Sequence, residues 1–221
     1  PAAQGQIHNG ADDNASGTAG LIEIAKLLSG RADELQRSIV FVAFSGEEWG
    51  LLGSQHFVET PPRPMDIVAM INMDMIGRSA NGYVNVEGVA TSPGFRDLAV
   101  AVHEEVAPDL DMNLADRPAS NSDHHSFFVA DVPVIGFFTG LHDDYHMPSD
   151  DADKINAEAG AAIATMAGEM AARLASTAER PAFTPPEAPA NAHGSAASSA
   201  STGSGYRVVF GTSPDMGYQK E

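Results

Sequence analysis

The sequence contains no cysteine, so disulfides and thiolate metal ligands are excluded, and any metal must be held by oxygen atoms and imidazole nitrogens. It is also poor in basic residues, with 12 Lys and Arg against 30 Asp and Glu and a net charge of −18. This imbalance argues against nucleic acid or an anionic membrane as a partner. No apolar run reaches the roughly 18 to 20 residues of a membrane span. At 221 residues, the chain is long enough for one well-buried domain and an additional segment.

The stretch SIVFVAFSGEEWGLLGS places two adjacent glutamates directly after an apolar run. Residues Ile39–Phe44 are apolar without alternation, which is typical of a strand covered on both faces in a parallel sheet. Glu47 and Glu48 are then expected at the carboxyl end of this strand, where open α/β sheets bind their ligands. The residues that follow fit the apolar face of a short helix: Trp49, Leu51, Leu52 and Phe57.

Two neighbouring carboxylates in such a position repel each other and lose hydration, which favours a nearby cation. With a divalent metal, one glutamate can be a ligand while the other takes a proton from water. The alternative is that the pair only begins a helix, where the helix dipole stabilises anions. Three further stretches of the sequence bear on this choice.

Two aspartates are candidate ligands. Asp13 lies in GADDNASGTAG, a loop rich in glycine, Asp and Asn that runs into a predicted helix. Such residues often only form turns, but glycines on both sides also let the backbone close around an ion. Asp74 follows the apolar run Ile67–Met73, where a free charge is costly. It either accepts backbone N–H groups as a structural residue or binds a metal.

The stretch SDHHSFFVADVPVIGFFTGLHDDYHMPSDDAD contains a further set of candidates. Pro133–Phe138 predicts a buried strand, and a polar loop follows it. In that loop His146 is a candidate ligand, and Tyr145 beside it can donate a hydrogen bond to a developing oxyanion. Asp123 is a candidate for a carboxylate that supports a ligand. The two histidines after it are interpreted as structural residues.

The remaining patterns indicate an α/β domain at residues 1–180. Its further elements are a helix from about Leu21, a strand at Tyr83–Val89, and helices at Phe95–Val106 and Ile155–Ala175. Residues 181–205 are rich in Pro, Ala, Ser and Gly and have little to bury, which predicts a flexible linker. Residues 206–221 begin with a predicted strand.

Five motifs resemble the zinc aminopeptidases of peptidase family M28 in their order: GADDNASGTAG, FVAFSGEEWGLLGS, NMDMIGR, SDHHSF and DYHMPSDDADKI. The resemblance implies a three-layer α/β/α sandwich around a mixed, mostly parallel sheet, with some amino-terminal strands absent. It also implies a site for two zinc ions and peptide substrates with a free amino terminus. The segment GYRVVFGTSPDMG is similar to the opening of the PDZ-like domain that follows the peptidase in some bacterial members.

On the matching positions, the resemblance makes Asp13 the carboxylate that bridges both zinc ions. Glu48 and His146 complete the protein ligands of one ion, and Asp74 binds the other. Family members carry a further histidine ligand in a His-x-Asp motif upstream of the first of these motifs. We therefore expect this sequence to be a piece of a longer protein, which the resemblance implies to be exported.

The resemblance gives Glu47 the role of general base towards a zinc-activated water, with Tyr145 helping to polarise the scissile carbonyl. Zinc itself rests on the resemblance, because three carboxylates and one imidazole also suit Mn²⁺ or Co²⁺. Two alternatives stay open. One is a glutaminyl cyclase, an acyltransferase with a single zinc on the same scaffold, and the other is a non-catalytic binding domain of the same fold.

Overall fold

The computed structural model describes residues 5–187 of the chain. Its helices are α1 (Gly17–Ser29), α2 (Leu52–Glu59), α3 (Phe95–Val106), α4 (His124–Phe128) and α5 (Ala157–Ser176). Its strands are β1 (Met70–Met73), β2 (Tyr83–Glu87), β3 (Asp111–Ala115) and β4 (Val134–Phe138). Short helical segments lie between them, and two of these carry site residues: η1 (Ala11–Ser16) and η3 (Glu47–Trp49).

The four strands form one sheet in the order β1-β4-β2-β3. β1 pairs with β4 and β2 pairs with β3 in parallel, whereas β2 and β4 are antiparallel. The predicted mixed, mostly parallel sheet is thus confirmed for the described residues. β1 and β4 end side by side, with Met73 opposite Phe137. The residues just beyond these two ends supply part of the site.

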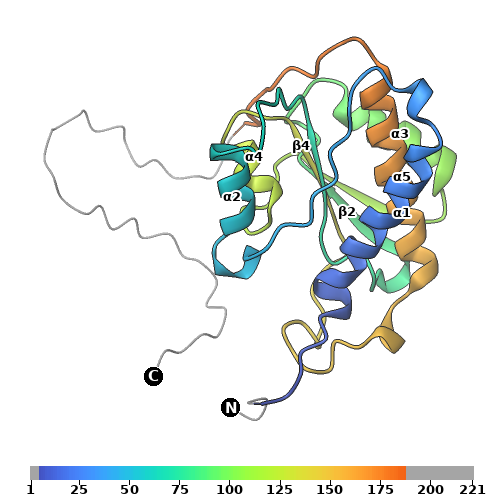
Figure 1. Cartoon of the computed structure of the whole chain (residues 1–221). Coiled ribbons are helices and arrows are strands. Elements are labelled where there is room, and N and C mark those ends of the chain that lie inside the picture. The colour runs from blue at the N-terminus through green and yellow to red at the C-terminus, as the bar shows by residue number, and fades with distance from the viewer. Residues whose placement is uncertain (1–4, 188–221) are drawn as a thin grey trace, which may run out of the picture. The chain divides into compact units, whose positions relative to one another are not determined.

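Helices cover both faces of the sheet (Figure 1). On one face α5 contacts α1 and α3, and both α1 and α5 contact β1. On the other face α2 and α4 contact each other, and α4 also contacts β1 and β4. This arrangement confirms the predicted three-layer α/β/α sandwich.

The core lies between the sheet and the layer of α1, α3 and α5. Its fully buried side chains include Val84, Val86, Phe95, Val102, Ile135, Phe137, Ile163, Met166 and Met170. Helix α5 begins after Asn156, whose side chain accepts the N–H of Ala159 at 3.2 Å. A side chain at Gly168 would meet Ile24 of α1 at 3.3 Å. The small residues of α5 therefore let it pack close to α1.

The segment Ile39–Phe44, predicted as a buried strand, is neither helix nor strand. None of its side chains is fully buried, and Val40 and Phe41 are 49% and 37% exposed. The prediction is wrong because no strand within residues 5–187 pairs with this segment. An apolar run records a tendency to be buried, but it does not show whether a hydrogen-bonding neighbour is present.

The short helix after the two glutamates begins later than expected. Trp49 belongs to η3 and is 80% exposed, and α2 starts only at Leu52. Gly46, Gly50 and Leu51 all have positive φ, which interrupts right-handed helical geometry before Leu52. The predicted apolar face is therefore wrong for Trp49 and Leu52, which are exposed, whereas Leu51 is buried.

The other predicted elements are present with small shifts at their ends. α3 has the predicted bounds, and α5 begins two residues later than expected. β2 ends at Glu87, before Gly88, which has a φ of 78°. β3 was not predicted, because Asp111 and Asn113 give it an exposed polar face with little apolar periodicity.

Residues 181–187, the described part of the predicted linker, contact the domain. The rings of Phe183 and Phe128 have centroids 5.7 Å apart, and the N–H of Thr184 donates to the carbonyl of Thr91 at 2.9 Å. The rest of the predicted linker and the segment 206–221 lie outside the described residues. None of the helices in the described part of the chain combines the length and the apolar character needed to cross a membrane.

We expect Ile163→Ala to lower the free energy of unfolding by about 2–5 kcal/mol, because this fully buried side chain leaves a cavity when it is shortened. Urea unfolding followed by circular dichroism measures the change. Thr165→Ala, on the exposed face of the same helix, is the control and changes the free energy by about 0.5 kcal/mol or less. Equal losses in the two variants would contradict the packing of α5 described above.

Candidate active site

The loop that carries Asp13 is held against the carboxyl end of β1. The side chain of Asn14 donates to the carbonyl of Met73 at 3.0 Å and accepts the N–H of Gly17 at 3.0 Å. Only glycine fits at position 17, because a Cβ there would lie 2.4 Å from the Met73 carbonyl oxygen. These contacts bring Asp13 into the same cavity as Asp74, the residue that follows β1.

Glu47 and Glu48 enter this cavity from η3. Gly46, with a φ of 71°, turns the chain just before them. The N–H groups of Gly50 and Leu51 then close the turn on the Glu47 carbonyl, at 3.0 and 2.8 Å. Glu48 is exposed, whereas Glu47 is partly buried. The turn therefore presents two neighbouring carboxylates to the cavity in different surroundings.

His146 meets Asp13 and Glu48 at one point. Its Nε2 atom lies 2.9 Å from Glu48 Oε1 and 3.2 Å from Asp13 Oδ2. The candidate ligand atoms of the three residues all lie within 4.8 Å of one another. Two carboxylates and one imidazole form a donor set that suits a divalent cation such as zinc. The structure thus brings three of the predicted ligands together in an arrangement that fits a metal.

Asp74, the fourth predicted ligand, lines the same cavity but is not part of this three-residue group. Its N–H donates to the Phe137 carbonyl at 3.0 Å, and the hydroxyl of Ser122 donates to Asp74 Oδ2 at 2.6 Å. Burial raises the pKa of Asp74 more than the hydrogen bond from Ser122 lowers it. Asp74 is therefore a half-buried carboxylate whose orientation is fixed by Ser122.

The cavity concentrates negative charge. Burial, followed by the charges of Asp74 and Glu48, raises the pKa of Glu47 to about 8. Burial, followed by the charges of Glu48 and Asp74, raises the pKa of Asp13 to about 7. Among the described residues, no Lys or Arg lines this cavity. Unless a cation lies among the carboxyl groups, Glu47 therefore stays mostly protonated at neutral pH and Asp13 titrates there.

Tyr145 lies against His146 at the edge of the group. The two rings are stacked, with centroids 3.7 Å apart and an interplanar angle of 25°. Burial, followed by the charges of Glu48 and Asp13, raises the pKa of Tyr145 above its ordinary value. The phenol therefore keeps its proton and can donate a hydrogen bond into the cavity, which it lines.

Asp123, predicted to support a ligand, precedes α4 and does not line the cavity. Its Oδ1 atom is buried without a hydrogen-bond partner in the described part of the chain. Burial raises the pKa of Asp123, and its charge contributes to the raised pKa of Glu47. Asp123 therefore acts on Glu47 through its charge, and Glu47 is not one of the predicted ligands.

The inner wall of this cavity, which has a volume of about 80 Å³, carries polar residues that the sequence patterns did not single out. The Asn72 side chain donates to Ser122 Oγ at 2.8 Å and lies 3.1 Å from His124 Nδ1. His124 Nε2 lies 3.6 Å from Glu87 Oε2. His124 is buried, as its structural interpretation requires, and it also lines the cavity. The only local signal for Ser122 and His124 is that they flank Asp123.

A model described as peptidase family M28 matches residues 2–171. The chain belongs to peptidase family M28. Aminopeptidase YwaD from Bacillus subtilis is 30% identical to this M28 chain over 161 residues, which cover 67% of this chain and 34% of YwaD. The structure is also similar to the aminopeptidase from Aneurinibacillus sp. strain AM-1, with a TM-score of 0.62 and 25% identity over 82% of this chain and 42% of that one.

The M28 chain also shares its fold with glutaminyl cyclase from Porphyromonas gingivalis. The TM-score is 0.60 at 19% identity, over 78% of this chain and 66% of the cyclase. At this identity, the likeness concerns the fold alone. The M28 chain spans about a third of the length of YwaD, so the activity of the whole protein has to be inferred from its site.

The raised pKa of Glu47 predicts how the metal-free M28 protein responds to pH. The stability penalty of ionising Glu47 is absent below its ordinary pKa of 4.5 and complete above its folded-state pKa of about 8. In the presence of a chelator, we expect the melting temperature of the wild type to fall relative to that of Glu47→Gln as pH rises between these values. Differential scanning calorimetry at several pH values measures the difference. A difference that stays constant or grows in favour of the wild type would contradict the raised pKa.

Proposed function

We propose that the protein is a metal-dependent aminopeptidase that hydrolyses the first peptide bond of peptides with a free amino terminus. The observation that carries this proposal is the convergence of Asp13, Glu48 and His146, two of which line the same cavity as Glu47. Metal-dependent peptide hydrolysis needs a metal that activates water and a carboxylate that accepts the proton of this water. Membership of peptidase family M28 and similarity to YwaD, which is named an aminopeptidase, support the same activity.

The proposed metal is zinc, bound by Asp13, Glu48 and His146. A second zinc ion would use Asp74 and share Asp13 with the first. Carboxylate oxygen and imidazole nitrogen are common zinc ligands, and the resemblance to zinc aminopeptidases favours zinc over other divalent ions. The charges of both Glu48 and Asp74 raise the pKa of Asp13, as expected of a carboxylate that serves two metal positions.

Zinc, when bound, polarises a carbonyl group and lowers the pKa of a water molecule towards about 7. Glu47 takes a proton from the attacking water on a carboxylate oxygen and returns it to the nitrogen of the leaving amine. Its partly buried position suits this exchange, because burial raises the pKa of a carboxyl group and so makes its carboxylate a stronger base than that of an exposed glutamate. Tyr145 donates a hydrogen bond to the carbonyl oxygen as negative charge develops there.

Preference for a free amino terminus follows from the charge of the cavity. Five acidic residues line it: Asp13, Glu47, Glu48, Asp74 and Glu87. An α-ammonium group is attracted to such surroundings, whereas a substrate carboxylate is repelled from every carboxylate that no metal neutralises. The amino end of a peptide is therefore the end that this site accepts.

A second candidate is a glutaminyl cyclase, favoured by the fold shared with the Porphyromonas gingivalis enzyme. That reaction is an acyl transfer within an amino-terminal glutamine. Asp13, Glu48 and His146 would hold the single metal ion that it uses. Asp74 in the same cavity favours the aminopeptidase, because it supports a second ion. A non-catalytic binding domain is the least supported, because such a domain needs neither Glu47 nor Tyr145 in the cavity.

The test compares the wild-type intact protein with Glu47→Gln on aminoacyl p-nitroanilides in the presence of zinc. We expect Glu47→Gln to lower kcat by about 100-fold or more while zinc content, measured by atomic absorption, stays unchanged. The reason is that the amide cannot accept the proton, although it leaves the proposed ligands in place. Glu59→Gln, at the exposed end of α2, is the matched control and retains wild-type kcat.

Two outcomes would contradict the proposal. Full activity in Glu47→Gln would remove this residue from its role as general base. Cyclisation of an amino-terminal glutamine peptide by the wild type, without release of amino acids from p-nitroanilides, would replace the aminopeptidase with the cyclase.

A further inference from the structure

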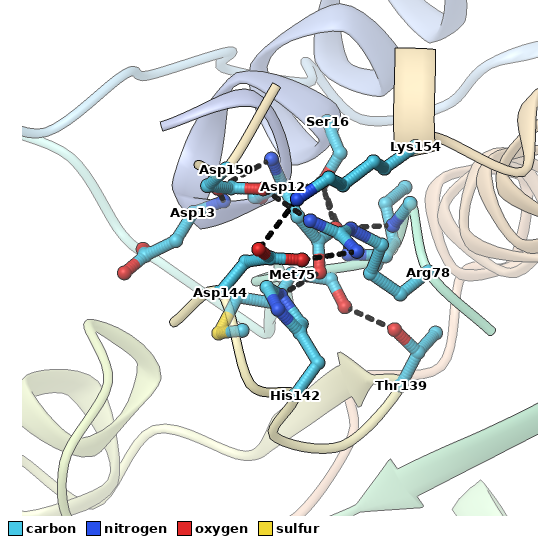
Figure 2. A network of polar contacts seen from close by, with 12 residues as sticks. Asp12, Asp13, Ser16, Met75, Arg78, Thr139, His142, Asp144, Asp150 and Lys154 are labelled. Atoms are coloured by element: carbon cyan, nitrogen blue, oxygen red, sulfur yellow. Dashed lines mark hydrogen bonds and ion pairs between the residues drawn. The ribbon is translucent and has the colours of Figure 1, made fainter. Parts of the chain in front are cut away.

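A network of hydrogen bonds and ion pairs joins two loops of the site (Figure 2). One loop carries Asp13 and the other carries His146. At the centre of the network is Arg78, whose side chain is 15% exposed. Its Nη1 atom donates to Asp144 Oδ2 at 3.1 Å, and its Nη2 atom donates to Asp150 Oδ1 at 2.9 Å.

Asp150 fixes the backbone of the first loop. Its Oδ2 atom accepts the N–H groups of Asp12 and Asp13 at 2.9 and 3.1 Å, and its backbone carbonyl accepts the N–H of Ala11 at 3.1 Å. Asp150 is 1% exposed, so these N–H groups and Arg78 are what satisfy its buried charge. In Figure 2 the Asp13 side chain points away from Asp150. Asp150 thus sets the direction of the Asp13 carboxylate through the backbone.

Asp144 fixes the turn that carries His146. Its backbone carbonyl accepts the N–H of Met147, the residue after His146, at 2.9 Å. Its side chain accepts the ammonium group of Lys154 at 2.5 Å in addition to the guanidinium of Arg78. Any shift of Asp144 is therefore transmitted to His146 through a closed turn.

We propose that Arg78 is a positioning residue that sets the separation between Asp13 and His146 and so prepares the site for its metal. The inference rests on the proposed function, because it takes these two residues as metal ligands. Arg78 acts on Asp13 through Asp150 and on His146 through Asp144.

An arginine suits this role because its planar guanidinium holds two carboxylates in a fixed geometry, whereas a lysine ammonium is a compact point charge whose three donors have no fixed fork. The two loops are also joined at a second place. Asp12 Oδ2 lies 3.1 Å from His142 Nε2, and Asp12 Oδ1 accepts the N–H of Gly77 at 2.6 Å. Because this second connection stays in place, we expect Arg78→Lys to keep the fold while the two ligands lose their fixed separation.

The experiment compares Arg78→Lys with Arg31→Lys in the intact protein. Arg31 is the matched control, because its guanidinium also joins two carboxylates, those of Glu34 and Glu169 at 2.9 Å each, and it lies on the α1 and α5 side of the domain. Calorimetric titration of the metal-free proteins with Zn²⁺ measures affinity, and the absorption spectrum of bound Co²⁺ reports ligand geometry. We expect Arg78→Lys to weaken Zn²⁺ binding about 10- to 100-fold and to change the spectrum, and Arg31→Lys to change neither.

Melting temperatures with and without Zn²⁺ separate positioning from a general loss of stability. Positioning by Arg78 makes the Zn²⁺-induced rise in Tm smaller in Arg78→Lys than in the wild type. A variant with a lower metal-free Tm but with wild-type Zn²⁺ affinity and Co²⁺ spectrum would overturn the inference.

Asp144→Asn provides a second, nearly isosteric variant if Arg78→Lys does not fold. It removes the charge that Arg78 and Lys154 contact, and the same loss of Zn²⁺ affinity is expected. Wild-type affinity in Asp144→Asn would overturn the inference on Arg78 while leaving the proposed function in place. A wild-type protein that binds no divalent metal would overturn both.

Discussion

Repulsion among carboxylates is the constraint on which the candidate site depends. Asp13, Glu47, Glu48 and Asp74 line one cavity, and Asp123 adds its charge near Glu47. Burial, followed by this repulsion, raises the pKa of Asp13 to about 7 and that of Glu47 to about 8. In the function proposed here, a divalent cation among these groups would offset the repulsion, with some of the side chains as its ligands and Glu47 as the base.

The surrounding structure holds these groups together when no cation offsets their repulsion. Asn14 attaches the Asp13 loop to the end of β1, and Asp150 binds the same loop through two backbone N–H groups. Helix α1 starts directly after this loop and packs on α5. The loop is therefore attached to the helices that cover the core. Apolar packing on the far side of the sheet thus supports a polar arrangement that is unfavourable by itself.

Local features of the sequence are enough to predict α3, α5 and an α/β domain, because apolar spacing indicates which face of an element is buried. The three-layer sandwich around a mixed sheet is predicted from the resemblance to family M28. The candidate ligands are predictable for a related reason, since acidic groups after apolar runs or glycine-rich loops need a partner. The strand predicted at Ile39–Phe44 fails because strand pairing is not a local property. The contacts that support the site are not local in the sequence either. Ser122 and Asp74 are 48 positions apart, and Arg78 and Asp150 are 72 positions apart.

Anomalous X-ray diffraction at the zinc absorption edge, from crystals of the intact protein grown with zinc, tests the central claim most directly. The account predicts an anomalous peak within bonding distance of Asp13, Glu48 and His146, the three residues whose candidate ligand atoms converge. Crystals that contain protein-bound zinc at other positions, with no peak among these three side chains, would contradict it.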